Sequence, residues 1–220
     1  TAPATRGAET VLSHNGLAAV SVNAAGVTID GFKFTGGSGR LIDWASASNI
    51  DGLTIENNIF NTPSGAAHGG VIQLSGTGTA HNGEIANNLF EGAGSSSWLY
   101  IGGTHSNGFS GLDISGNDFV GSADNAAFQG AANFAGLHIA GNYFGHALIA
   151  GLNMGSLDDP TIDANTFVGV QDVAMQIGTV NGGVIENNII DGTGSGYNSG
   201  GVLYASGIEV WGGQYGTATS

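Results

Sequence analysis

One eight-residue pattern recurs seven times along the 220 residues, and this repeat limits the folds open to the chain more than any other feature. Each copy carries a central isoleucine followed five positions later by a large apolar residue. The isoleucines are Ile29, Ile55, Ile85, Ile114, Ile139, Ile162 and Ile185. Their successive numbers differ by 26, 30, 29, 25, 23 and 23, and one more step of 23 reaches Ile208. A constant phase at this period indicates a solenoid in which each repeat forms one coil.

The segments between the copies show no helical periodicity, so the coils are expected to consist of short strands. The large apolar residues that follow the isoleucines are Phe34, Phe60, Phe90, Phe119, Phe144, Phe167 and Ile190. In parallel strands stacked about 4.8 Å apart, residues at one phase form continuous interior columns. The predicted fold is an all-β, right-handed parallel β-helix of about seven or eight coils, with residues 1–220 as a single domain and an eighth partial coil at Ile208.

Six asparagines share a second phase, three positions after the isoleucine. They are Asn58, Asn88, Asn117, Asn142, Asn165 and Asn188, and the first copy has Phe32 there instead. A stacked column of amides can satisfy the backbone groups of a buried turn and can also bond from coil to coil. The residue before each of these positions is glycine, asparagine or, at Ala164, alanine, and the first two types tolerate a positive φ. We therefore interpret the asparagines as an internal structural ladder.

Apolar segments between the copies predict a second sheet. They read LIDW from Leu41, VIQL from Val71, WLYI from Trp98, AFQ from Ala127, LIAGL from Leu148 and MQI from Met175. Taken together, these motifs resemble the pectin-lyase-like family of right-handed parallel β-helix repeats, over about Val11 to Trp211. The opening ATRGAETVL followed by GVTIDGF is similar to β-helix modules of large secreted bacterial proteins. The resemblance implies a fold, and it does not by itself imply an activity.

The charge balance limits the classes of partner that the chain can bind. Three basic residues stand against 17 acidic ones, a formal net charge of −14, so nucleic acid is excluded as a partner and divalent cations are favoured. Ca²⁺ is the expected cation. No apolar run approaches the roughly 20 residues of a membrane helix, so no membrane insertion is expected. Acidity together with 41 glycines resembles secreted bacterial proteins, so we expect a segment or mature part of a protein that is extracellular or on the cell surface.

Three side chains are candidates for catalysis. Glu84, Asp113 and His138 each precede the isoleucine of consecutive copies, so they are expected side by side on an outer sheet face. Two carboxylates beside an imidazole could separate their pKa values for acid and base work, or hold Ca²⁺. The simpler interpretation is a solvated polar stripe. Enzymes that the resemblance implies use a basic residue for lyase chemistry, and none follows Arg40.

Two carboxylate pairs are candidates for a cation site. Asp30 and Glu56 follow the isoleucines of neighbouring copies, and so do Asp163 and Glu186. Like charges one coil apart repel each other, and a bound Ca²⁺ would relieve this repulsion. Screened surface charge is the alternative.

Amides and aromatic rings on the second sheet are candidates for ligand binding. They are Trp44, Gln73, Trp98, Tyr100, Gln129 and Gln176, with Asp43 at the same phase as the amides. Aromatic faces cover the apolar faces of sugars and amides bond their hydroxyls, so these residues predict a strip for a neutral polysaccharide.

Three functions follow from these residues. The first is a noncatalytic extracellular module for structure or adhesion, stabilised by Ca²⁺ and able to stack end to end into a homo-oligomer or filament through open coil edges. The second is a polysaccharide lyase or glycoside hydrolase that uses Glu84, Asp113 and His138. The third is a glycan-binding module.

Overall fold

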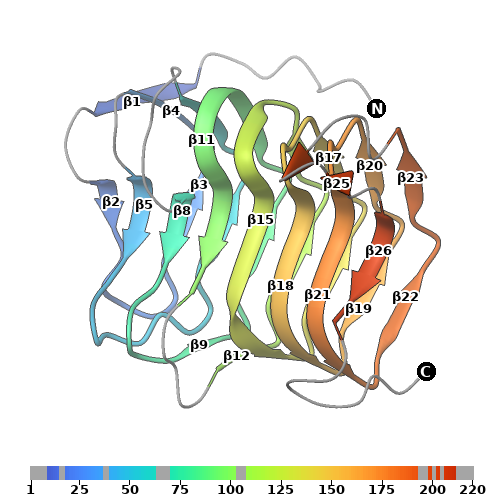
Figure 1. Ribbon diagram of the computed structural model, residues 1–220. Helices are drawn as coiled ribbons and strands as arrows, with labels where there is room; N and C mark the ends of the chain where they lie inside the picture. Colours follow the sequence, from blue (N-terminus) through green and yellow to red (C-terminus); the bar gives the residue numbers. More distant parts are fainter. Residues whose placement is uncertain are drawn as a thin grey trace.

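The computed structural model is a parallel β-solenoid of about six turns (Figure 1). It describes residues 9–14, 18–36, 40–62, 70–102, 108–192, 198–199, 202–203 and 206–211. The strands follow one another along one axis, from β1 at one end to β22, β23 and β26 at the other. All regular structure within these ranges is β, so the predicted fold class is confirmed.

Each turn of the solenoid contributes one strand to each of three faces, here called sheets A, B and C. Sheet A contains β1 (Thr10–His14), β4 (Phe32–Gly36), β7 (Ile59–Thr62), the first part of β11 (Leu89–Ile101), β14 (Asp118–Phe119), β17 (Tyr143–Gly145), β20 (Thr166–Val168) and β23 (Ile189–Asp191). Sheet B contains β2 (Ala18–Ser21), β5 (Arg40–Trp44), β8 (Gly70–Leu74), the second part of β11, β15 (Ser122–Ala135), β18 (Ala150–Asp158), β21 (Val173–Asn181) and β26 (Ser206–Val210).

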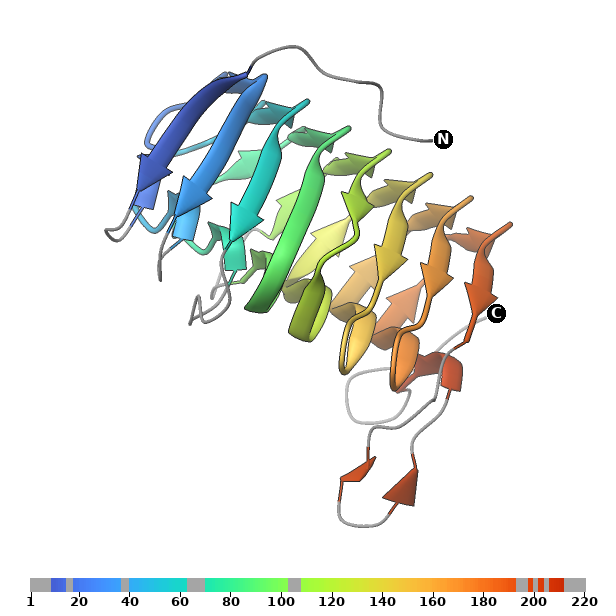
Figure 2. The same ribbon diagram turned by 90° about the horizontal axis from the view of Figure 1, so that it is seen from above.

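Sheet C is made of short strands that carry the repeated isoleucine. They are β3 (Thr28–Asp30), β6 (Thr54–Glu56), β10 (Glu84–Ala86), β13 (Asp113–Ser115), β16 (His138–Ala140), β19 (Thr161–Asp163) and β22 (Val184–Glu186). Short strands β9 (Ala80–His81) and β12 (Phe109–Ser110) extend sheet B beside the end of β15. An antiparallel pair, β24 (Asn198–Ser199) and β25 (Val202–Leu203), extends away from the solenoid (Figure 2).

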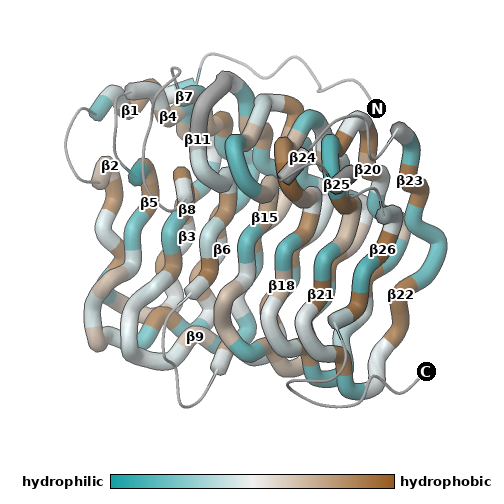
Figure 3. Tube along the Cα trace, in the orientation of Figure 1, coloured by the Kyte–Doolittle hydropathy of each residue, from teal (hydrophilic) through white to brown (hydrophobic). Residues whose placement is uncertain are grey.

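Two apolar columns fill the interior, as the repeat predicts. The seven isoleucines pair in register through sheet C. The six phenylalanines stack along sheet A with ring centroids 4.5 to 5.0 Å apart, and all six are fully buried. Figure 3 shows that hydrophobic and hydrophilic segments recur at matching heights along β15, β18, β21 and β26. Burial of these large side chains, worth roughly 1.5 to 3 kcal/mol each, is the main stabilising contribution.

The asparagine ladder is confirmed in atomic detail. The Oδ1 atom of Asn117 accepts hydrogen bonds from the backbone N–H and the Nδ2 of Asn88, at 3.0 Å each. The Nδ2 of Asn117 donates to the Ile85 carbonyl at 2.7 Å and to Asn142 Oδ1 at 3.0 Å. The same arrangement recurs along the ladder, and Phe32 in the first copy donates its N–H to Asn58 Oδ1. Each amide therefore links three consecutive coils.

The bend before each ladder position is left-handed in every copy. Its residues are Gly31, Asn57, Asn87, Gly116, Gly141, Ala164 and Asn187, with φ between 53° and 73°. The expectation of a positive φ is therefore confirmed. Ala164 is the one residue of the set that is neither glycine nor asparagine, and it is strained there because its Cβ crowds the following carbonyl.

Replacing Ala164 with glycine is expected to stabilise the protein by about 1 kcal/mol, because the left-handed conformation costs an L-residue roughly 1 to 2 kcal/mol. The urea midpoint should rise in chemical denaturation. The matched control is Ala140→Gly in strand β16, where glycine should lower the midpoint because it weakens a strand. Equal shifts for both variants would contradict the explanation.

Two predictions about the coils are corrected. The seven strands of sheet C are separated by six steps along the axis, so the solenoid has about six turns, slightly fewer than the predicted seven or eight. Ile208 does not begin an eighth isoleucine position in sheet C, because it lies in β26 of sheet B, paired with Met175. In one coil, a short segment separates Phe167 from Met175. In the next coil, a much longer segment separates Ile190, which pairs with Phe167, from Ile208, which pairs with Met175. This longer segment shifts the phase, so the apparent eighth step of the repeat was a coincidence.

Candidate functional site

Sheet C brings the three predicted catalytic side chains together on consecutive strands. Glu84, Asp113 and His138 pair in register across β10, β13 and β16. His138 Nδ1 lies 2.9 Å from Asp113 Oδ2, and His138 Nε2 lies 3.5 Å from Asp163 Oδ1 in β19. The arrangement is therefore a histidine between two aspartates from the coils on either side. Sequence reasoning had placed Asp163 only in a cation pair and missed its contact with His138.

The two aspartates favour the protonated imidazole. The hydrogen bond from His138 to Asp113 raises the pKa of His138, and the charges of Asp113 and Asp163 add to this, while partial burial opposes it. The Nδ1 atom of His138 is hydrogen-bonded to Asp113, Nε2 lies within ion-pair distance of Asp163, and the side chain is 43% exposed. The described residues show no hydrogen bond that joins Glu84 to this group. The arrangement fits an ion cluster that ties three coils together better than a separated acid and base.

Stability should depend on pH through His138. A folded-state pKa raised above the unfolded value of about 6.5 stabilises the protein below that pH, and the contribution is lost as the pH rises through the folded-state pKa. The Tm advantage of the wild type over His138→Gln should therefore be larger at pH 5.5 than at pH 8.5, by roughly a degree or two. Thermal melts of both proteins at the two pH values measure it. Asp113→Asn should remove most of the difference, and an advantage that grows with pH would contradict the assignment.

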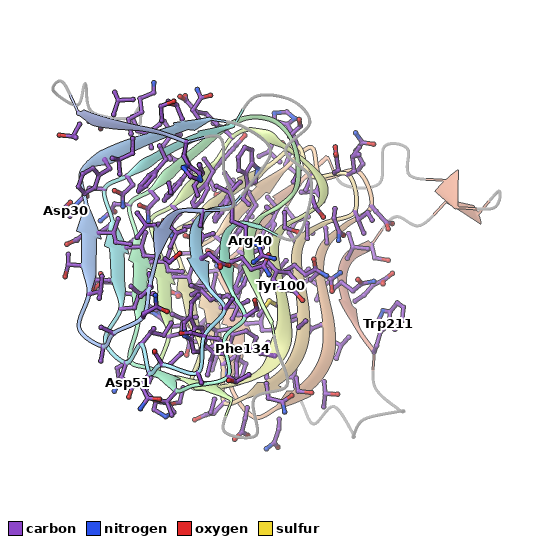
Figure 4. All side chains as sticks on the ribbon, turned by 90° about the vertical axis from the view of Figure 1, so that its left-hand side faces the viewer. Asp30, Arg40, Asp51, Tyr100, Phe134 and Trp211 are labelled. Carbon is purple, nitrogen blue, oxygen red and sulfur yellow. The ribbon has the colours of Figure 1, made fainter. Side chains whose placement is uncertain are left out.

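The predicted cation pairs are in register but each supplies only two carboxylates. Asp30 pairs with Glu56, and Asp163 pairs with Glu186. Asp30 points away from the solenoid (Figure 4) and accepts a hydrogen bond from Asn57 Nδ2 at 2.9 Å. Within the described ranges, no group of three or more His, Cys, Asp or Glu side chains has the geometry of a metal site. Since Ca²⁺ takes six to eight oxygen ligands, these pairs could offer it weak sites completed by water.

Sheet B aligns the predicted ligand-binding amides in one row, here called the sheet B polar row. It consists of Ser21, Asp43, Gln73, Tyr100, Gln129, Asn153, Gln176 and Glu209. Asn153 was missed because the segment from Leu148 gave no clear phase, although Asn153 and Gln176 are separated by the same step as Ile162 and Ile185. The row has charged members near both ends: Asp43, which accepts a hydrogen bond from Arg40 at 2.8 Å, and Glu209.

The two tryptophans expected beside this row lie inside the solenoid. Trp44 and Trp98 are fully buried, and their indole N–H groups donate to the backbone carbonyls of Ser48 and Gly121. A Cβ added at Gly121 would come within 2.4 Å of the Trp98 ring, so the ring packs directly on that glycine. The interpretation of Trp44 and Trp98 as ligand-binding residues is therefore wrong, because no ligand on the surface can reach them.

The amides of the polar row retain unused hydrogen-bonding capacity. Gln129 Oε1 accepts from Ser97 Oγ and Asn125 Nδ2 at 3.3 Å each. Gln73 donates to Ser75 Oγ, but its Oε1 is buried without a partner among the described residues. Asn153 and Gln176 form no side-chain hydrogen bond with any described residue. The amides of Asn153 and Gln176, which are partly exposed, therefore keep donors and acceptors that a group at the surface could bond, whereas Gln73 Oε1 is buried.

A further polar cluster escaped the sequence reasoning. His81 Nδ1 lies 2.6 Å from Ser110 Oγ, and Asp51 accepts the His81 backbone N–H at 2.8 Å and the Thr79 hydroxyl at 2.9 Å. Asp51, His81 and Ser110 share a phase four positions before the isoleucine, and this spacing was the available signal. The backbone hydrogen bond from His81 lowers the pKa of Asp51. Because Asp51 holds the backbone and not the imidazole ring, the cluster lacks the hydrogen bond that orients a catalytic triad.

Comparison with protein-family models, with curated proteins and with solved structures found no match. In the described part of the chain, no helix has the length and hydrophobicity needed to span a bilayer.

Proposed function

We propose that this chain is a noncatalytic extracellular module for structure or adhesion, from a secreted protein related to the pectin-lyase-like β-helix family. The observation that carries the proposal is the continuity of the interior. The ladder and both apolar columns run through the described coils without interruption, as suits a rigid spacer. The ion cluster around His138 connects neighbouring coils, through a hydrogen bond to Asp113 and an ion-pair contact with Asp163.

The competing enzymatic function is tested by product analysis. The wild type and Asp113→Asn are incubated with acidic and neutral polysaccharides, with Ca²⁺ and with EDTA, and the products are separated chromatographically. Neither protein is expected to release products. Turnover by the wild type that falls at least about a hundredfold in Asp113→Asn would overturn the proposal in favour of a lyase or hydrolase. The same samples, melted with Ca²⁺ and with EDTA, measure whether Ca²⁺ stabilises the fold.

Binding of a neutral polysaccharide along the sheet B polar row is a second candidate function, favoured by the partly exposed amides of Asn153 and Gln176, which no described residue engages. Amide groups bond sugar hydroxyls, and Tyr100 offers a half-exposed ring for an apolar sugar face. The acidity of the chain disfavours anionic glycans.

Replacing Tyr100 or Gln176 with alanine is expected to weaken glycan binding about tenfold each, because each loses roughly 1 to 1.5 kcal/mol of stacking or hydrogen bonding. A glycan array followed by titration calorimetry on the best neutral ligand measures the affinity. Thr166→Ala on the outer face of sheet A is the matched control and should bind as the wild type does. Equal loss in the control, or no binding by the wild type, would contradict this candidate.

A further inference from the structure

Exposed apolar side chains gather at the last coil of the solenoid, and one more lies on the first coil. The large exposed ones among the described residues are Val11, Val120, Val184, Ile189, Ile208, Val210 and Trp211. Five of these seven belong to the last coil, here defined as β22, β23, β26 and Trp211. Val11 belongs to the first coil, defined as β1, β2 and β3. Trp211 projects away from the ribbon (Figure 4). Apolar surface collected at one end of a solenoid is typical of a docking face.

Both ends also present strand edges. Among the described residues, β23 pairs only with β20 and β26 only with β21, while β1 pairs only with β4 and β2 only with β5. The two sets of edges face opposite ways along the axis and run in the same direction. A second copy shifted along the axis could therefore extend sheets A and B by parallel pairing.

We infer that the last coil binds the first coil of a second copy of this chain, head to tail, with β1 on β23 and β2 on β26. The inference deepens the proposed structural role, on which it rests, by naming the partner. A head-to-tail contact is heterologous, so it does not close and builds a filament.

One interior column of sheet A and one of sheet B continue across this joint. Leu12 lies in the phenylalanine column and would cover Ile190. Val20 lies in the column that runs through Ile42 to Met175 and ends at Ile208, so it would cover Ile208. On the outer face of sheet A, Val11 would meet Ile189, and these two side chains are 56% and 61% exposed in the single copy. Each contact removes apolar surface from water on both partners.

The last asparagine of the ladder would also gain a hydrogen-bond partner at the joint. Each ladder asparagine donates its backbone N–H to the amide of the next coil, and among the described residues Asn188 has no next coil. Thr10 pairs with Phe32, which holds the ladder position in the first copy. A second copy would therefore place the Thr10 hydroxyl, a hydrogen-bond acceptor, at the position above Asn188.

Charge disfavours the contact of two last coils. The strands of the last coil carry Glu186, Asp191 and Glu209 and no basic side chain, a net charge of −3. The strands of the first coil carry one charged side chain, Asp30. Two last coils would therefore repel each other more strongly than a first coil and a last coil.

Blocking each end separately tests the inference. Ile208→Asp blocks the last coil and Val20→Asp blocks the first, and either charge facing an apolar residue should weaken association at least about a hundredfold. Sedimentation velocity over a concentration series up to the millimolar range is expected to show species that lengthen with concentration for the wild type. Each blocked variant should remain monomeric, and an equimolar mixture of the two should form a dimer and nothing larger.

Val120→Asp is the matched control, because Val120 is the one exposed apolar residue of this set between the two ends, and it should associate as the wild type does. If Val20→Asp lowers the Tm, Val11→Asp is used in its place, because it also puts a charge on the edge of the first coil but at a more exposed position. A monomeric wild type, or a blocked variant that dimerises by itself, would overturn the head-to-tail joint. Neither result touches the proposed structural role, which fails instead if the product analysis detects glycan turnover.

Discussion

Replacing Asn117 with alanine is expected to lower the free energy of unfolding by about 4 kcal/mol, since two or more buried backbone groups lose their partners at roughly 1 to 3 kcal/mol each. The Ile85 carbonyl loses a donor at 2.7 Å, and the Asn88 N–H loses an acceptor at 3.0 Å. Asn117 is fully buried, so water cannot replace these hydrogen bonds without a new cavity. Urea denaturation followed by circular dichroism measures the loss.

The control for this prediction is the same substitution at the end of the ladder. Asn188 is partly exposed and bonds to Asn165 and to the Ile162 carbonyl, so water can reach the groups left by Asn188→Ala. The expected loss there is about 1 to 2 kcal/mol. Equal losses at Asn117 and Asn188 would show that the ladder acts locally and not through burial between coils.

Replacing Phe119 with alanine is expected to cost about 4 to 5 kcal/mol. A fully buried phenylalanine loses roughly 3 to 5 kcal/mol on truncation, and each stacked aromatic pair adds about 0.5 to 1.5 kcal/mol. Phe119 stacks on Phe90 at 4.5 Å and on Phe144 at 5.0 Å, so truncation removes two pairs and leaves a cavity in the middle of the solenoid. Urea unfolding measures this loss too.

Two variants separate burial from ring stacking. Phe119→Leu keeps most of the volume and should cost about 1 to 2 kcal/mol. Ile190→Ala, in the same column but in the last coil, should cost less than Phe119→Ala because Ile190 is only partly buried. A loss for Phe119→Ala no larger than for Ile190→Ala would contradict a column that is continuous along the axis.

The period and the contents of the columns could be predicted because every coil repeats the same short segment. Ile114, Asn117 and Phe119 occupy one strand, one bend and the next strand, so their relative positions depend only on local geometry. Stacking then brings the same residue types from other coils into contact. The register of Glu84, Asp113 and His138 follows from the same phase and was predicted correctly for that reason.

Positions far from the isoleucine in each coil could not be predicted as well. The coils differ in length, as the unequal steps between successive isoleucines show, and this variation collects in the segments that lead to sheet B. The segments around Trp44 and Trp98 gave strands without showing which side chains face inward. Two consecutive residues of β5, Leu41 and Ile42, are both buried, so simple alternation fails near this bend.

The sequence by itself determined that the chain winds into stacked coils, because isoleucine, asparagine and phenylalanine recur at constant offsets and only a parallel β-solenoid superimposes them. The tertiary structure alone decided that both tryptophans lie inside, that Asp163 joins His138, and that Ile208 closes a sheet B column. These outcomes depend on how loops of unequal length return the chain to the stack. Loop length is visible in a sequence, but the phase at which a loop returns is decided by packing against the coil below.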